Sequence, residues 1–380
     1  MRALRRRHGF AMVALSCIAG LAHAQKPQTV QDYLAPLKRA SCAQGVAPAE
    51  PQAIDLNIAR VPLQGVNPMR KTIGELTLVG GYHLTSSDPR FGGLSGLDVL
   101  EDGSLLAVSD AGSFVWIGLD ADGVTPVSAR IADMRDAAGD TFKRKVDADA
   151  EGLAVVDGVA LVSFEGDHRV AVYDLQRCGA SARGAPVASA GLPAAFAREG
   201  LKVGGNEGAE ALAVTPDWYL IAGIEAKAGA ASAVSARAIE AAAEFDIRIG
   251  EGAPELVGLD VIADEDPAGD LVVYSLHRST NAMATNVIVL VETVFAREFD
   301  QTGLPAHLLS EIGERSHVRF RPKGSRTLAG MNLFVTIDNF EGVAARKMPD
   351  GRTRLYVVAD NNFSASQRTL LMVYDVAERD

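Results

Sequence analysis

Carboxylate side chains recur at matching places along this chain, and they are the residues best suited to chemistry. They open or close short apolar runs at Glu151, Glu165, Glu210, Glu225, Asp260, Glu341 and Asp360. Crowded carboxylates raise each other's pKa, so a group of them needs a counter-charge. A calcium ion can provide this counter-charge, because it binds six to eight oxygen ligands in loose geometry. We therefore predict that these acids, with the amide oxygen of Asn362, are calcium ligands.

Other residue types around these acids refine the prediction. Asn206 and Asn361 could add further amide oxygens. Zinc suits the set poorly, since it offers one histidine, His277, with His168 nearby, and the chain has no H-E-x-x-H spacing. For any single acid a structural role is the alternative, because a glutamate before glycine can accept backbone N–H bonds and order a turn. The metal prediction therefore depends on the set.

The acids belong to a unit that the chain repeats five times. The five copies are Ser95–Asp110, Glu151–Glu165, Glu210–Glu225, Asp260–His277 and Glu341–Asp360. Each copy has two apolar runs around a turn of Asp, Gly or Pro, such as Asp102-Gly103. Such residues supply the backbone angles of a tight reversal, so each copy predicts a β-hairpin.

Recurring strand units of this size predict an all-β fold, a β-propeller with one blade per hairpin. Five blades can be counted, and a sixth could lie between His277 and Glu341 or in residues 25–70. A β-sandwich with coincidental turns is the alternative. The last copy lacks an outer strand. Thr72–Leu84 could supply it, which would join the two ends of the chain in one blade and remove an open sheet edge.

This arrangement would bring the acids together. In a hairpin the start of one strand lies beside the end of the next, so Glu151 should lie near Glu165, Glu210 near Glu225, and Glu341 near Asp360. The first strand of each propeller blade lines the central channel, so these acidic ends should share one rim. The turns should lie at the opposite end, where a structural role explains their aspartates: Asp102, Asp157, Asp217 and Asp350.

The regions outside the repeats have distinct compositions. Residues 1–24 combine a basic start, a short apolar stretch and a small-x-small end at Ala24, which predicts a secretory signal peptide cut after about Ala24. No apolar run is long enough to span a membrane, so we expect a periplasmic or secreted protein. Residues 25–70 should form an irregular extension and residues 71–380 the propeller. The Ala-rich segment Ala226–Phe245 should be a loop or short helix inserted in the third blade.

Charge and cysteine content limit the partners and the compartment. The chain has 37 Lys and Arg against 48 Asp and Glu, a formal net charge of −11, and four of the arginines lie in the expected signal peptide. An acidic surface repels phosphate backbones, so nucleic-acid binding is not expected. Export permits a disulfide between Cys42 and Cys178, although sequence alone cannot place the two within bonding distance.

The last repeat also carries a family resemblance. Asn339-Phe340-Glu341-Gly342, followed by Asp360-Asn361-Asn362-Phe363 and Gln367-Arg368-Thr369, resembles the phytase-like, or "esterase-like activity of phytase", family of exported bacterial proteins. The similarity extends over about residues 90–376. It implies a hydrolase of phosphate or other esters, with Glu and Asp residues at the site. One departure is Leu276-His277-Arg278, where relatives tend to read Leu-Glu-Arg, which would weaken the fourth blade's part in a metal site.

The acidic rim and the resemblance together predict an exported, calcium-dependent hydrolase of small-molecule esters or phosphoesters. Glu151 or Glu341 would act as general base, and Arg368 would hold an anionic substrate. Lys347 is a second candidate cation, and a pairing of Arg368 with Asp360 is the structural alternative. Two other functions fit the same residues: a non-catalytic ligand- or protein-binding propeller with a structural calcium ion, and a lactonase-type propeller enzyme.

Overall fold

The repeated segments form antiparallel hairpins in the computed structural model, as their turns predict. In the first repeat, β5 (Leu94–Val99) pairs with β6 (Leu105–Ser109), and Asp102-Gly103 lies in the turn between them. Gly103 has a φ of 85°, a backbone angle that residues with side chains rarely adopt. The structure describes residues 30–166, 168–187, 208–228, 231–239, 245–263, 269–280, 286–299 and 318–378.

Each hairpin continues outward into a larger sheet, which we call blades 1 to 5 in chain order. From the centre outward, blade 1 contains β5, β6, β7 (Ser113–Leu119), β8 (Pro126–Asp133) and β1 (Gln52–Ile54). Blade 2 contains β9 (Ala150–Val156), β10 (Val159–Phe164), β11 (Val170–Asp174) and β12 (Ala185–Pro186). Blade 3 contains β13 (Ala211–Val214), β14 (Tyr219–Ala228), β15 (Ala231–Ala238) and β16 (Phe245–Ile249).

The last two blades complete the ring. Blade 4 contains β17 (Glu255–Ala263), β18 (Leu271–Thr280), β19 (Asn286–Phe299) and β20 (Val318–Met331). Blade 5 contains β21 (Asn339–Lys347), β22 (Thr353–Asp360), β23 (Leu370–Val376), β4 (Leu76–Thr85) and β2 (Asn57–Arg60), with β3 (Thr72–Ile73) paired to β4. The predicted closure is confirmed, because β4 from the N-terminal part pairs with β23 from the C-terminal part.

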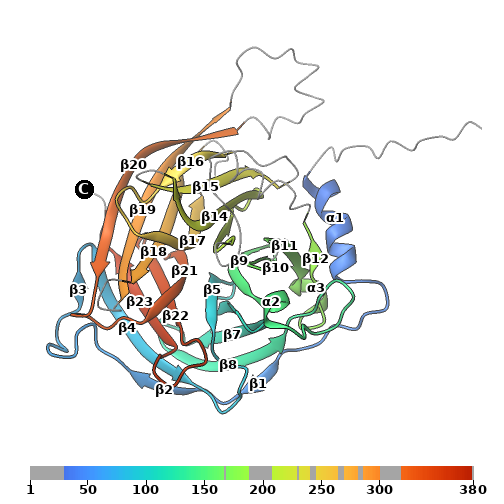
Figure 1. Cartoon of the computed structure of the whole chain (residues 1–380), viewed down its shortest axis with the longest axis horizontal. Helices are drawn as coiled ribbons and strands as arrows, with labels where there is room; N and C mark the ends of the chain where they lie inside the picture. Colours follow the sequence, from blue (N-terminus) through green and yellow to red (C-terminus); the bar gives the residue numbers. More distant parts are fainter. Residues whose placement is uncertain are drawn as a thin grey trace, which may run out of the picture.

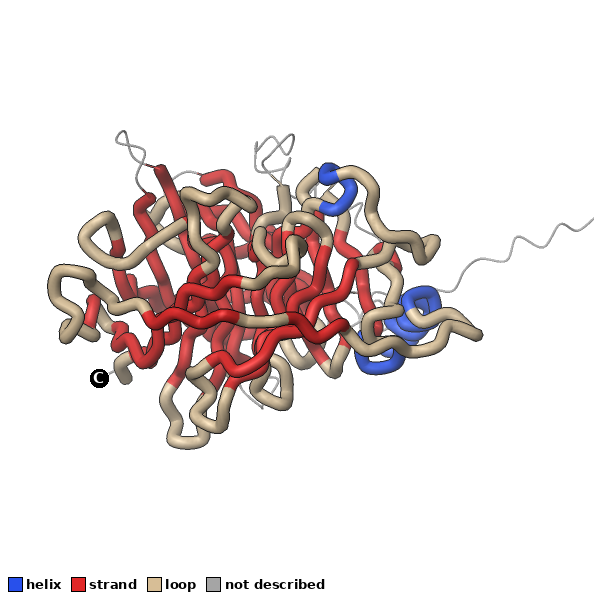
Figure 2. Tube along the Cα trace, turned by 90° about the horizontal axis from the view of Figure 1, so that it is seen from below, coloured by secondary structure: helices blue, strands red, loops and turns tan. Residues whose placement is uncertain are grey.

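The fold is a five-bladed β-propeller, which confirms the predicted class and sets the number of blades at five in the described residues (Figure 1). The first strands of the blades contact one another in the order β5, β9, β13, β17, β21 and back to β5, so they form the inner ring of strands. Seen from the side, the strands occupy the middle of a flattened body whose loops cover two opposite faces (Figure 2).

Five apolar clusters hold the blades together, one at each junction between neighbouring blades. Successive side chains on a strand point to opposite faces, so one strand serves two junctions. Along β6, Leu105 and Ala107 pack toward blade 5, whereas Leu106 and Val108 pack toward blade 2. Each blade is therefore buried on both faces, which explains the nearly continuous apolar runs of the repeats.

The described part of residues 25–70 is more than an irregular extension, since β1 and β2 are outer strands of blades 1 and 5 and a helix packs on the outside of the propeller. Helix α1 (Val30–Ser41) buries Leu34 completely in the cluster between blades 2 and 3. A disulfide joins Cys42, just after α1, to Cys178 at the end of the short helix α3 (Leu175–Cys178), with 5.6 Å between their Cα atoms. The two cysteines that export would allow to pair therefore do so.

One expectation was wrong, and others lie outside the described residues. The Ala-rich segment is no inserted helix, because most of its described residues lie in β14 and β15, which pair with each other. Alanine's helix preference gives way here to pairing within the sheet. The expected signal peptide and Asn206 lie outside the described residues. None of the helices in the described part of the chain has the length and apolar character to cross a bilayer.

Candidate functional site

The five inner strands meet at the axis with the same short pattern. The equivalent triplets are Ser95-Gly96-Leu97, Glu151-Gly152-Leu153, Glu210-Ala211-Leu212, Val257-Gly258-Leu259 and Glu341-Gly342-Val343, and together they line one narrow cavity. Its volume is about 10 Å³, which is close to the space of a single water molecule. The strands approach this closely because four of the five middle positions are glycine.

A β-bulge leaves the first residue of the pattern unpaired in three of the inner strands. In β5, Leu94 pairs with Ser109 and Gly96 with Val108, so Ser95 has no residue opposite it. Val257 and Glu341 are left over in the same way in β17 and β21. Bulges re-aim side chains and are frequent beside functional sites. We call the five first residues the inner ring: Ser95, Glu151, Glu210, Val257 and Glu341.

The second strand of each blade brings another residue to the same end of the channel. Asp360 pairs with Asn339, and Arg278 pairs with Glu255, each two residues before an inner-ring position. In blades 1 and 2 the backbone N–H groups of Asp110 and Glu165 donate to the equivalent carbonyls, those of Gly93 and Asp149. We call this set the outer ring: Asp110, Glu165, Glu225, Arg278 and Asp360. The predicted acidic rim thus exists, with one arginine in it.

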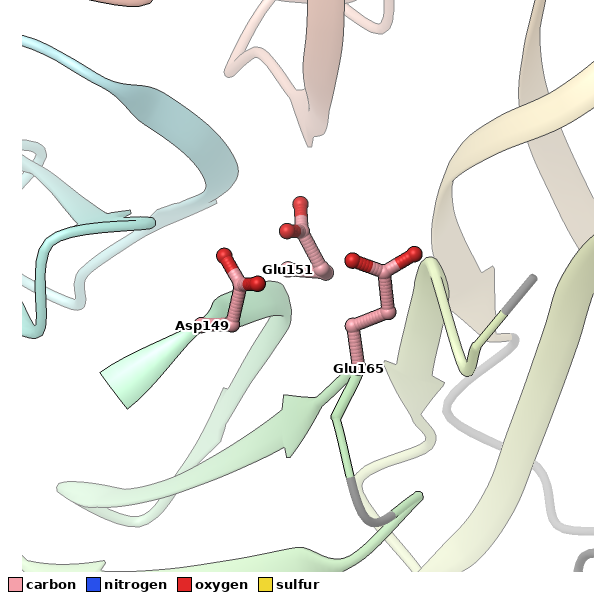
Figure 3. Close-up of side chains that lie close together, drawn as sticks. All are labelled: Asp149, Glu151 and Glu165. Atoms are coloured by element: carbon pink, nitrogen blue, oxygen red, sulfur yellow. The ribbon is translucent and has the colours of Figure 1, made fainter. Parts of the chain in front are cut away.

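Blade 2 provides the tightest group of acids. Asp149, Glu151 and Glu165 each place a carboxylate oxygen within 4.8 Å of the others. Figure 3 shows the three carboxylates gathered around a common space, with Asp149 and Glu151 on one segment and Glu165 on another. Sequence reasoning named Glu151 and Glu165 but missed Asp149. The sequence feature that could have identified Asp149 is its spacing in Asp149-Ala150-Glu151, since alternate residues of an extended chain lie on the same side.

Burial and mutual repulsion raise the pKa values of the three inner-ring glutamates, and also those of Asp110, Glu165 and Asp360 in the outer ring. Burial is the main cause for Glu151, whose pKa lies well above its ordinary value, and Glu210 and Glu341 raise it further. The pKa of Glu210 is raised well above its ordinary value for the same reasons, with Glu165 as the largest contributor after burial. Burial raises the pKa of Glu341 to about 8 despite the opposing charge of Arg278. Burial also raises the pKa of Asp360 to about 6.

Two cations oppose these acids in the part of the chain that the structure describes. Arg278 donates to Glu341 Oε1 at 2.8 Å and to Glu225 Oε1 at 3.2 Å. Burial alone would lower the pKa of Arg278, but the two glutamates raise it overall, so the guanidinium keeps its charge. Lys145, in the short helix α2 (Lys145–Ala148), lies 3.0 Å from Asp110 and 2.8 Å from Asp149. A site of this charge is built to attract further cations.

Two residues expected at the rim lie elsewhere. His277 is fully buried within blade 4, where its ring nitrogens contact Pro254 O at 3.0 Å and Ser275 Oγ at 2.8 Å. The next residue, Arg278, takes the rim position instead. Asp260 lies three residues beyond Val257, deeper along the inner strand, where it accepts the backbone N–H of Ala345. The apolar run of blade 4 begins earlier than its sequence suggested, and Val257 leaves that blade without an inner-ring acid.

Asp260 has a counterpart at the same depth in blade 1. Asp98 accepts the N–H of Val155 across the junction between blades 1 and 2, as Asp260 accepts Ala345 across the junction between blades 4 and 5. Burial raises the pKa of Asp98 to about 7, and the pKa of Asp260 is raised by burial and by Asp98. These two aspartates therefore join inner strands of neighbouring blades.

The predicted cations and amides of the last repeat also differ from expectation. Arg368 donates to Asp338 Oδ2 and to the carbonyl of Ile337, both at 3.1 Å. Its acidic partner is therefore Asp338 and not Asp360. Asn362 is exposed, and its backbone N–H donates to Asp360 Oδ1 at 2.6 Å. Asn361 Oδ1 accepts the N–H of Gly93 at 3.0 Å.

The remaining candidates lie away from the rim. Lys347 ends β21, at the far end of that strand from Glu341. The turn aspartates lie at the same far end, and two of them make the expected local bonds: Asp102 accepts the N–H of Ser104, and Asp350 that of Arg352.

The fold and this site define a class of protein: a five-bladed β-propeller whose channel opens into a buried, mainly acidic mouth. The sequence of residues 89–363 matches the Phytase-like family, described as "Esterase-like activity of phytase". The chain belongs to this family, which confirms the resemblance carried by the last repeat. No curated protein matches the chain.

Several solved structures are similar in outline to this chain. They include the PQQ-bound aldose sugar dehydrogenase of Streptomyces coelicolor, with 12% identity and a TM-score of 0.39 over 86% of this chain and 100% of that one. Another is the PQQ domain of pyranose dehydrogenase from Coprinopsis cinerea, with 11% identity and a TM-score of 0.37 over 86% and 99% of the two chains. These values are too low to support any inference about function.

Proposed function

We propose that this protein is an exported, metal-dependent ester hydrolase, with calcium as its ion and phosphoesters among its substrates. The observation that supports this most directly is the group of Asp149, Glu151 and Glu165, whose carboxylate oxygens lie within 4.8 Å of one another beside Glu210. Family membership supports the ester-hydrolase class.

The donor atoms of this group fit a hard cation. All of them are carboxylate oxygens, which suit calcium, magnesium or manganese better than zinc or copper. Burial first, and then repulsion between the glutamates, raises the pKa values of Glu151 and Glu210, and a divalent ion would relieve that repulsion. His277 is turned into the blade, so no imidazole from this position favours zinc. Glu341, Glu225 and Asp360 would lie around the same mouth as further carboxylates.

The chain's own residues supply the rest of the mechanism. A bound calcium ion would polarise the ester oxygen and lower the pKa of a water molecule. Glu341 would accept a proton from the attacking water, and its pKa of about 8 lies near a neutral working pH. Arg278, which contacts both Glu341 and Glu225, would hold an anionic substrate in place of Arg368.

Export is part of the proposal, and the disulfide between Cys42 and Cys178 supports it. Such bonds persist mainly in oxidising compartments. The expected signal peptide predicts a mature N-terminus near Gln25. N-terminal sequencing of the protein recovered from a periplasmic fraction would test this, and recovery of an uncut chain from the cytoplasm would contradict it.

A non-catalytic propeller with a structural ion is the second candidate. The narrow cavity on the axis favours this non-catalytic function, because a volume of about 10 Å³ holds one water molecule or ion and no organic substrate. In that case substrate would have no place at the inner ring, and any ligand would bind above it or elsewhere.

One experiment separates these candidates. Purified protein would be analysed for bound metals, stripped with EDTA, and assayed on carboxylic esters, phosphomonoesters, phosphodiesters, phytate and lactones with calcium, magnesium or manganese added back. We expect hydrolysis of an ester or phosphoester that EDTA abolishes and calcium restores, and that Glu151→Gln reduces at least tenfold. Asp102→Asn, in a turn at the far end of the channel, is the matched control and should leave turnover unchanged. Calcium-dependent stability without turnover would favour the structural ion, and lactone turnover alone a lactonase-type enzyme.

A further inference from the structure

Large apolar residues are exposed together where two loops meet at the outer edge of blades 4 and 5. Val66 and Met69 lie on the loop between β2 and β3, and they are 90% and 85% exposed. Leu333 and Phe334 lie on the loop between β20 and β21, and they are 49% and 70% exposed. We call these four residues the apolar patch. Single exposed apolar residues are ordinary, but a group of large ones marks an interaction site.

The two loops are bonded to each other, so the four residues belong to one stretch of surface. The backbone N–H of Thr336 donates to the carbonyl of Leu63 at 2.7 Å, and its hydroxyl donates to the carbonyl of Pro62 at 2.6 Å. Figure 1 shows the two loops side by side near β3, at the lower left of the view. Residues far apart in the sequence thus combine in the apolar patch.

The apolar patch is carried on ordered turns. Backbone hydrogen bonds close three turns, over residues 64–67, 67–70 and 332–335. Each turn has one or two patch residues at its central positions, which are its tip. Leu63 and Val335 instead point inward and pack in the apolar cluster between blades 4 and 5. Buried apolar residues therefore fix these loops, and the exposed ones form a convex surface of turn tips.

The charge around the apolar patch is positive, although the chain as a whole carries a net charge of −11. Residues 56–74 contain Arg60, Arg70 and Lys71 and no Asp or Glu. All three cations are exposed, and none is paired with an acid of the described part of the chain. The acid of the other loop, Asp338, is already bonded to Arg368. An anionic partner would therefore meet cations here that are free to bind it.

The shape of the surface selects the kind of partner. A stable protein interface needs about 800 Å² on each partner and close shape complementarity, so protruding turn tips would need a matching hollow. A lipid bilayer has no such requirement, because its headgroup region admits protruding apolar side chains. Lys and Arg beside them are attracted to anionic headgroups. Convex apolar tips with unpaired cations fit a lipid surface best.

We propose that the apolar patch docks this protein on a membrane that contains anionic lipids. Val66, Met69 and Phe334 enter the headgroup region, and Arg70 and Lys71 contact the lipid phosphates. The loop with Phe334 leads into β21 at the end that carries Glu341, so this loop lies on the side of the propeller where the channel opens. The proposal does not depend on the hydrolase activity.

Flotation of the full mature chain with lipid vesicles would test this surface. One vesicle is pure phosphatidylcholine, and the other is equal parts phosphatidylcholine and phosphatidylglycerol. EDTA is present throughout, so that calcium cannot bridge the headgroups to the acidic mouth. We expect the mixed vesicles to bind about tenfold more tightly than the neutral ones, and added salt to remove this difference.

Variants of the exposed residues would locate the contact. Met69→Ser combined with Phe334→Ser should weaken binding to the mixed vesicles about tenfold, because two large apolar groups no longer enter the lipid. Arg70→Gln combined with Lys71→Gln should remove the preference for anionic lipid. These four side chains are exposed, so each double variant should keep the Tm of the wild type.

Val66→Ser and Val127→Ser form a matched pair of controls. Val127 is 57% exposed on β8 of blade 1, outside the apolar patch. Val66→Ser should weaken vesicle binding, and Val127→Ser should leave it unchanged. The proposal fails if the wild type does not float with the mixed vesicles, if the Met69, Phe334 variant floats as well as the wild type, or if both valine variants lose binding equally.

Analytical ultracentrifugation would identify the other possible occupant of the apolar patch, a second copy of this chain. We expect the wild type and the Met69, Phe334 variant to have the same mass in solution. A wild-type dimer that the variant converts to a monomer would overturn the membrane proposal. None of these outcomes bears on the hydrolysis of soluble esters, so the two proposals fail separately.

Discussion

The guanidinium of Arg278 lies 2.8 Å from the carboxylate of Glu341, and through this contact blade 4 places a cation in a ring where the other four blades place acids. The same guanidinium reaches Glu225 of blade 3 at 3.2 Å. Arg278 thus connects three neighbouring blades at the channel mouth. It supplies part of the counter-charge that a bound ion would complete.

Replacing Arg278 by glutamine should destabilise the metal-free protein. Glu341 would keep its buried position without its cation, and breaking one side of a buried pair costs about 3–5 kcal/mol. Added calcium should restore much of this loss, because the ion can take over the neutralisation. Thermal unfolding with EDTA and with calcium would measure both effects.

A matched control for this variant is Arg297→Gln. Arg297 forms an ion pair with Asp217 at 2.7 Å, and its side chain is also buried, but the pair lies at the turn end of blade 3. The Arg297→Gln substitution should lower the Tm, and added calcium should not restore it. If calcium rescued both variants equally, Arg278 would have no special link to a metal site.

Stability of the metal-free protein should fall as the pH rises through neutrality. The pKa of Glu341 is about 8 in the folded protein against 4.5 ordinarily, so between these values the folded state holds a proton that the unfolded chain has released. The shifts of Glu151 and Glu210 act in the same direction. Exposed acids with lowered pKa values, such as Asp102, act oppositely, but only near and below pH 4.

Unfolding curves at several pH values in EDTA would show this slope, with the Tm decreasing from about pH 5 to pH 8. Calcium should reverse it, because the ion replaces the protons and its affinity grows as they leave. The gain in Tm on adding calcium should therefore be larger at pH 8 than at pH 5. A metal-free Tm that rises steadily over this range would contradict the pKa shifts of the mouth.

Much of this architecture is readable in the repeats, and the exceptions have physical causes. Each hairpin carries its own turn and apolar runs, so the blades and the closing strand follow from local pattern. The local pattern does not predict which residue of blade 4 belongs to the inner ring. The triplet Val257-Gly258-Leu259 contains no acid, and Asp260 resembles the acid that begins the other repeats. Here the small residue before leucine, and not the acid, marks the equivalent position.

The roles of individual side chains depend on contacts between blades, which no single repeat contains. Arg278 acts at the mouth because neighbouring blades bring Glu225 and Glu341 to it. Arg368 is unavailable because a loop brings Asp338 to it. Sequence spacing predicts which end of a strand a residue occupies, but not its partner from another blade.

Alanine at Gly96 should destabilise the ring of inner strands. A Cβ atom there would lie 2.5 Å from the carbonyl oxygen of Glu151 and 2.8 Å from the backbone nitrogen of Leu153. Both contacts are backbone of the next blade, which cannot move without opening the ring, so a loss of about 1–3 kcal/mol is expected. Gly330→Ala is the control, because a Cβ at that strand position meets nothing within 4 Å. Denaturant unfolding would measure both, and equal stability of the two variants would contradict the close approach.

Removing the disulfide should loosen the N-terminal segment from blade 2 while leaving the channel mouth intact. The bond between Cys42 and Cys178 spans 136 residues of sequence and fixes the chain beside α1, whose Leu34 is buried between blades 2 and 3. Loss of a native disulfide of this kind costs about 2–5 kcal/mol.

The Cys42→Ser, Cys178→Ser double variant should therefore show a lower Tm than the wild type under oxidising conditions, and the Tm values of the two proteins should converge when a reductant is added. Its calcium affinity, measured by titration below the unfolding temperature, should match the wild type, because neither cysteine touches the acidic rings. A double variant as stable as the oxidised wild type would show that α1 is held by its apolar packing alone.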